Sequence, residues 1–140
     1  MTSDKKNTHE KIQLMDILKL LDDEFGALAK RFQFHNIPLN QAREWEDKNV
    51  AMPGVYVFWT MDSGVIRVGR SYDNTRKRAL EHLSANKGMG TGGMVSMLKG
   101  DDSDRLLLFN SDVQENRHWI AALEIYFERV LLPKVPPGRR

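Results

Sequence analysis

Hydrophobic side chains recur at steps of three and four residues near the start of the chain, which predicts an amphipathic helix over Thr8–Phe32. Asn7 and Glu10 resemble the capping box that begins such a helix. A stripe of this kind packs either on a sheet of the same chain or on a helix of a second subunit. We favour the first arrangement, because the run is short for a coiled coil. The apolar stripe consists of Leu14, Leu18, Leu21, Phe25, Leu28 and Phe32.

The middle of the chain changes to the pattern of a β-hairpin. β-Branched and aromatic residues fill Gly54–Thr60 and Val65–Gly69, and the link between these two segments ends in Gly64. The segment before the hairpin, Phe34–Val50, has no sustained period and contains Pro38. We therefore expect a turn and a short helix there.

The later segments predict helical elements around a third strand, which together with the hairpin indicates an α+β fold. In chain order, these elements are a helix over Asn74–Ser84, a glycine-rich loop over Lys87–Gly93, a helical turn over Met94–Lys99, a strand over Arg105–Asn110 and a helix over Glu115–Leu132.

Composition narrows the class of protein. The 140 residues and 41% apolar content fit one globular domain with its own core. The absence of cysteine excludes disulfides and thiolate metal sites. No apolar run is long enough for a membrane helix, and the first residues lack the pattern of a secretory signal, so we expect a cytoplasmic protein. The net charge of +2 is too small to indicate nucleic-acid binding by itself.

Side chains suited to phosphate chemistry gather in the hairpin and the helix after it. Tyr56 lies in the first strand, Arg67 in the second, and Arg70 where the chain leaves the sheet. Arg78 and His82 are four residues apart, so they share one face of the helix. A phenol or imidazole can take a proton from water, and guanidinium groups neutralise phosphoryl oxygens. This combination points to a phosphodiester as substrate.

A single acidic residue interrupts the most apolar stretch of the last predicted helix. Glu124 lies between Leu123 and Ile125, where burial of a carboxylate without a partner is costly. A hard divalent cation such as Mg²⁺ could satisfy it. An ion pair with Arg78 or Arg129 is the structural alternative.

The order and spacing of these residues resemble the GIY-YIG nucleases. The resemblance extends over about Pro53–Pro137 and leaves residues 1–52 as an N-terminal helical extension packed on the core. The motifs that carry it are Gly54-Val55-Tyr56, Arg67-Val68-Gly69, Arg78, His82 and Glu124.

The resemblance implies a three-stranded antiparallel sheet flanked by helices and a DNA endonuclease that uses Mg²⁺ or Mn²⁺. Glu124 would hold the metal and Arg78 would stabilise charge on the phosphate. His82 would lie near the attacking water, which Tyr56 would orient or deprotonate. Arg70 matches a position where many members of the family have a lysine that contacts the site.

The chain departs from the family pattern at three places. Arg67 stands where a tyrosine is expected, Arg78 comes one residue late, and Pro136 lies near the position of a missing asparagine. These departures leave the identity of the general base open. Arg76 and Lys77, if not simply a solvated helix face, would join Arg67 and Arg70 in binding the DNA backbone.

Two other functions remain possible on the sequence alone. One is a binding module that kept this scaffold but lost efficient cleavage, which the substitution at Arg67 favours. The other is a structural module that forms a homodimer through the N-terminal helix.

Overall fold

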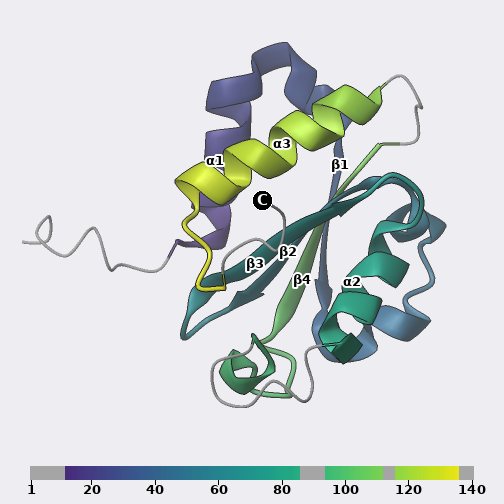
Figure 1. Cartoon of the computed structure of the whole chain (residues 1–140), viewed down its shortest axis with the longest axis vertical. Helices are drawn as coiled ribbons and strands as arrows, with labels where there is room; N and C mark the ends of the chain where they lie inside the picture. The colour runs from purple at the N-terminus through teal and green to yellow at the C-terminus, as the bar shows by residue number, and fades with distance from the viewer. Residues whose placement is uncertain (1–11, 86–93, 112–115, 136–140) are drawn as a thin grey trace, which may run out of the picture.

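A computed structural model describes residues 12–85, 94–111 and 116–135 (Figure 1). The helices are α1 (Leu14–Phe25), α2 (Thr75–Ala85) and α3 (Arg117–Val130). The strands are β1 (Gln33–Pro38), β2 (Gly54–Thr60), β3 (Gly64–Ser71) and β4 (Arg105–Asn110). Short 3-10 helices are η2 (Gly26–Arg31), η3 (Leu39–Glu44), η4 (Lys48–Ala51) and η6 (Met94–Met97).

The described strands form one antiparallel sheet in the order β1-β4-β2-β3. The α+β class is therefore confirmed, but the expectation of three strands is wrong, because β1 adds a fourth. The sequence predicted a turn and a short helix in this region because β1 is mostly exposed, with Ile37 as its one buried residue. Pro38 is tolerated because it ends an edge strand.

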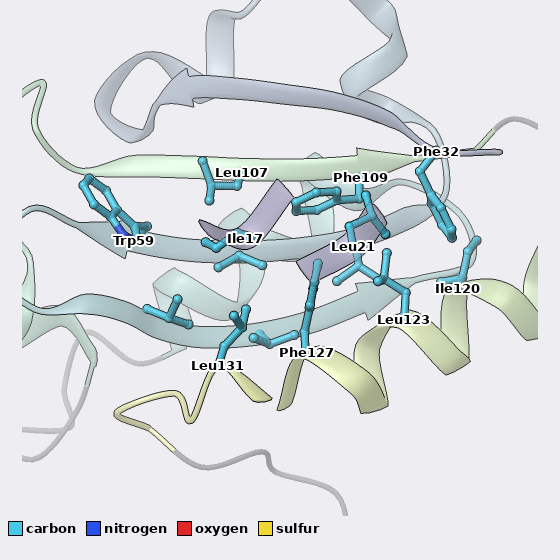
Figure 2. Close-up of a cluster of buried hydrophobic side chains, with 14 of the residues drawn as sticks. Ile17, Leu21, Phe32, Trp59, Leu107, Phe109, Ile120, Leu123, Phe127 and Leu131 are labelled. Carbon is cyan, nitrogen blue, oxygen red and sulfur yellow. The ribbon is translucent and has the colours of Figure 1, made fainter. Parts of the chain in front are cut away.

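Side chains alternate between the two faces of the central strand β2, and both faces are buried. Val55 and Val57 face a core that α1 and α3 cover, and Figure 2 shows side chains of both helices meeting over the sheet. Tyr56 and Phe58 face the opposite core, which α2, η3 and η4 cover. The sheet is thus the middle layer of three (Figure 1).

The first helix is shorter than the sequence predicted. α1 ends at Phe25, because Gly26 adopts a φ of 54° and the chain continues as a 3-10 helix. The beginning of the predicted helix and its proposed capping box at Asn7 and Glu10 lie outside the described residues. Most of the apolar stripe packs on the chain's own sheet: Leu21 and Phe32 are buried in the core, and Leu14, Leu18 and Phe25 pack against it. Ile17, the most buried residue of α1, was not part of the predicted stripe.

The other predicted elements lie close to their expected positions. The hairpin and the third predicted strand are present as β2, β3 and β4, and α2 is displaced by one residue from its predicted bounds. α3 begins and ends within the predicted helix, whose first residue, Glu115, lies outside the described part, as does the glycine-rich loop. No helix in the described ranges has the length and apolar character needed to cross a membrane. The division of the chain at residue 53 stays a prediction.

Candidate functional site

A cleft of about 600 Å³ opens beside the edge strand β3, between α2 on one face of the sheet and α3 on the other. The backbone of Lys134 and Val135 hydrogen-bonds to the first part of β3, at Val65 and Ile66. The second part of β3 lines the cleft. Six residues that the sequence singled out also line it: Tyr56, Arg67, Arg70, Arg78, His82 and Glu124.

Tyr56 reaches the cleft from the interior of the sheet because its cross-strand partner is a glycine. The Tyr56 side chain lies across Gly69, where an added Cβ would come within 2.3 Å of the phenol oxygen. The ring is 1% exposed, and its hydroxyl lies 2.6 Å from Nδ1 of His82 on α2. A hydrogen bond between the phenol of Tyr56 and the imidazole of His82 thereby joins β2 to α2.

Burial and nearby charge keep this pair neutral. Desolvation raises the pKa of Tyr56 to about 12, against the opposing effect of Arg78 and Arg67. Desolvation also lowers the pKa of His82 to about 4, and the positive charges of Arg67 and Arg78 lower it further. At neutral pH the two groups therefore share a hydrogen bond between an uncharged phenol and an uncharged imidazole.

Arg67 lies on the same face of the sheet as Tyr56, because it pairs with Phe58, two residues further along β2. Phe58 pairs with Arg67 and Trp59 with Val65, so Ile66 is the extra residue in β3. The Nε atom of Arg67 is buried and finds no hydrogen-bond partner within the described chain. A buried guanidinium nitrogen without an acceptor is costly, and an anion in the cleft would satisfy it.

Arg78 stands at the outer side of the cleft on α2. Its guanidinium lies 3.7 Å from Glu81, and about half of each side chain is exposed. A pair of this kind contributes little to stability in water, about 0–1 kcal/mol. Arg78 can therefore turn toward an anion in the cleft at small cost.

Glu124 enters the cleft from α3 and is held by Arg70. The carboxylate is 5% exposed and forms an ion pair with the Arg70 guanidinium at the end of β3. The sequence had suggested Arg78 or Arg129 as its ion-pair partner, and the pair with Arg70 corrects that suggestion. Burial acts to lower the pKa of Arg70, but the hydrogen bond and charge of Glu124 override this and raise the pKa.

Two predicted DNA-contacting residues lie elsewhere. Arg76 and Lys77 line a separate groove beside Arg43, on another side of α2. The Arg76 guanidinium donates to the backbone carbonyl of Trp45 at 2.8 Å and less closely to that of Ala42. Arg76 thus ties α2 to η3, and the structure does not bring it to the cleft.

Tyr72 and Glu128 line the cleft although the sequence analysis did not select them. For Glu128 a signal was available, because it lies one helical turn after Glu124 on the same face of α3. For Tyr72 no periodic pattern existed, since it follows the end of β3. The guanidinium of Arg117 lies over the Tyr72 ring, 4.6 Å from its centre.

The cleft offers few metal ligands. Within the described ranges, no group of three or more histidine, cysteine or acidic side chains is arranged to hold a metal ion. Glu124 and Glu128 are the carboxylates that line the cleft. One or two carboxylates suit Mg²⁺, which keeps several of its waters. A cation on Glu124 would have to share or displace the contact with Arg70.

No family model, no curated protein and no solved structure matches the chain.

Proposed function

We propose that this chain is a divalent-metal-dependent DNA endonuclease of the GIY-YIG type. The observation that carries the proposal is the convergence of Tyr56, Arg67, Arg78, His82 and Glu124 on one cleft. These residues come from two strands and two helices. Side chains far apart in sequence that share a cleft and suit one chemistry are the best indication of a reaction site.

The charge of the cleft favours a phosphodiester as its ligand. Three guanidinium groups line it against two carboxylates, so a net positive charge remains for an anion. Arg67 would bind the phosphate within the cleft, where its buried Nε lacks an acceptor. Arg78 would approach from α2 as charge develops on the phosphoryl oxygens.

The Tyr56–His82 pair supplies a route for the proton of the attacking water. Tyr56 can accept this proton only as its own hydroxyl proton passes to Nδ1 of His82. The hydroxide then bonds to phosphorus, and the bond to the leaving oxygen breaks. Arg67 and Arg78 disfavour the imidazolium that forms, but a bound phosphate offsets their charges. The base therefore becomes effective when the substrate is in place.

Glu124, with Glu128 beside it, would hold a hydrated Mg²⁺ or Mn²⁺. When bound, such an ion supplies Lewis-acid stabilisation of the developing phosphoryl charge. Arg70 would then leave the carboxylate in part and keep its contact with the ring of Tyr72.

A plasmid-nicking assay tests the proposal. Supercoiled DNA is incubated with the protein in Mg²⁺, in Mn²⁺ and in EDTA. We expect relaxed product only with metal, and its loss in Glu124→Gln and in Arg78→Ala. Glu44→Gln removes an exposed carboxylate far from the cleft and should nick at the wild-type rate. Absence of nicking by the wild-type protein would refute the proposed endonuclease activity. Nicking that survives Glu124→Gln would refute the assignment of that activity to this cleft.

The second candidate is a nucleic-acid-binding or partner-binding module without efficient cleavage. The ion pair between Arg70 and Glu124 favours it, because the carboxylate expected to bind metal is already neutralised. Salt-sensitive retention of DNA without nicking would support this candidate.

A further inference from the structure

The arginines around the cleft differ in what their side chains already contact. Arg70 is held by Glu124, and Arg78 lies beside Glu81. Arg117 is exposed, and no ion pair joins it to a carboxylate of the described residues. Its guanidinium lies over the ring of Tyr72, which lines the cleft. Arg117 thus extends the basic lining at the rim and keeps its donors available to a ligand.

The phase of α3 places Arg117 on the side of the helix that carries the site. Glu124 follows Arg117 by seven residues and Glu128 by eleven, so the three share one stripe of the helix. Arg129 lies about 100° further round the helix from Glu128 and belongs to a different face. The stripe therefore leads from the carboxylates of the cleft to Arg117 at its rim.

The position of Arg117 does not serve the helix itself. It occupies the first residue of α3, where the helix dipole is positive and the first turn holds no acidic residue. A cation there is unfavourable by about 0.3–1 kcal/mol when exposed. Contact with an aromatic ring offsets a similar amount, about 0.5–1 kcal/mol. The local energetics of the helix thus give little reason for an arginine at this position. Binding of an anionic ligand would give one.

The ring of Tyr72 also limits the distance between two guanidiniums. The Cζ atoms of Arg70 and Arg117 lie 5.0 and 4.6 Å from the ring centre, so they are at most about 10 Å apart. Phosphates of one strand advance about 3.4 Å along the axis of a duplex per nucleotide. Two guanidiniums this close can contact neighbouring phosphates of one strand, so Arg117 reaches a phosphate close to one held beside Arg70.

We propose that Arg117, oriented by Tyr72, is a second phosphate-binding residue that holds the DNA backbone next to the phosphate in the cleft. This inference rests on the proposed function and adds to it a positioning residue outside the family-like motifs. The contact carries no sequence information, because it is made to the backbone. Its role is to set where along the strand the cleft engages DNA.

The test measures DNA binding rather than cleavage. A short labelled duplex is titrated with the full chain in EDTA over a series of salt concentrations. Loss of one phosphate contact should lower the slope of log K against log salt by about 0.9. We expect this decrease in Arg117→Ala, with a several-fold weaker affinity at low salt. The matched control Arg129→Ala removes the same charge from the same helix and should leave the slope unchanged.

The Tyr72 ring provides an independent comparison. Tyr72→Phe keeps the ring and should bind DNA like the wild type, whereas Tyr72→Leu should lose part of the affinity through poorer orientation of Arg117. Thermal unfolding of each variant is recorded alongside. Arg117→Ala should unfold near the wild-type temperature, since it removes a charge that the helix dipole disfavours.

The outcomes separate this inference from the proposed function. A slope that falls in Arg67→Ala but stays unchanged in Arg117→Ala would overturn the role of Arg117 alone. Equal decreases in Arg117→Ala and Arg129→Ala would also overturn it, because only net charge would then matter. Wild-type protein that binds but does not nick refutes the nuclease and leaves the phosphate contact standing. Failure of the wild type to bind DNA at all would overturn both.

Discussion

The hydroxyl of Tyr56 and Nδ1 of His82 lie 2.6 Å apart, although one residue belongs to the centre of the sheet and the other to a helix that covers it. The contact is possible because Gly69, opposite Tyr56, leaves room for the phenol to cross β3. This partly buried hydrogen bond joins α2 to the sheet. The arrangement of the candidate site is therefore coupled to the packing of the core.

The neutral state of His82 predicts a stability that falls in mild acid. Its pKa is about 4 in the folded protein and about 6.5 when exposed, so between these values the unfolded chain binds more protons. The free energy of unfolding should therefore decrease as the pH falls from about 6.5 toward 4, by less than about 1.4 kcal/mol per pH unit because the ring is only partly buried.

Urea titrations at a series of pH values measure this effect. His82→Gln cannot take up a proton and should show a shallower decrease over the same interval, while carboxylates elsewhere act equally in both proteins. Parallel curves for wild type and His82→Gln would contradict a depressed pKa at this residue.

A methyl group at Gly69 should disrupt the site without removing any of its polar groups. In Gly69→Ala the new Cβ would lie 2.3 Å from the phenol of Tyr56, so the ring must move and its bond to His82 must lengthen. Overpacking of this kind costs about 1–3 kcal/mol. We expect a matching loss in the free energy of unfolding in urea.

Shortening Tyr56 tests whether this clash is the cause. The double variant Gly69→Ala with Tyr56→Val should be more stable than the sum of the single effects predicts, because the methyl group then has space. Additive losses would show that Gly69 is required by the backbone and not by the Tyr56 ring.

Removing Arg70 should leave a buried carboxylate without its ion-pair partner. Arg70→Ala is expected to destabilise the fold by about 1–3 kcal/mol, less than a fully buried pair because the arginine is partly exposed. The double variant with Glu124→Gln should recover part of this loss, since an amide is less costly to bury than an unpaired charge. If Arg70→Ala is as stable as the wild type, the ion pair with Arg70 is not what stabilises the buried charge of Glu124. Denaturant unfolding of the wild type, the two single variants and the double variant gives the coupling energy of the pair in a double-mutant cycle.

Local signals in the sequence explain which elements could be predicted. The hairpin has dense β-branched and aromatic residues, and α2 has capping residues before it, so both were placed within one or two residues. β1 was missed because its only strong signal is the pairing with β4, a strand far along the chain. Gln33, for example, pairs with Asn110. Long-range pairing of an exposed edge strand leaves little trace in local periodicity.

The same limit applies to the candidate site. Spacing alone placed Arg78 and His82 on one helix face, and an apolar context predicted the burial of Glu124. The choice of Arg70 as the partner of Glu124 depends on where β3 leaves the sheet relative to α3, which no local pattern encodes. The contact of Arg117 with Tyr72 depends on the same geometry.

The positive charge of Arg67 should have a measurable effect on the pKa of His82. The guanidinium is the second cause, after burial, of the low pKa of the imidazole. In Arg67→Gln the pKa of His82 should therefore rise above about 4 but remain below 6.5, because burial still disfavours the charged ring.

A smaller rise is expected in Arg78→Gln, since Arg78 lowers the pKa of His82 less than Arg67 does. Lys77→Gln, on the same helix but outside the cleft, is the control. The His82 ring protons are followed by NMR as the pH is varied. An unchanged titration in Arg67→Gln would mean that Arg67 does not contribute to the low pKa of His82. The base would then not sense an anion bound at Arg67, and substrate-dependent activation of the Tyr56–His82 pair would have to be abandoned.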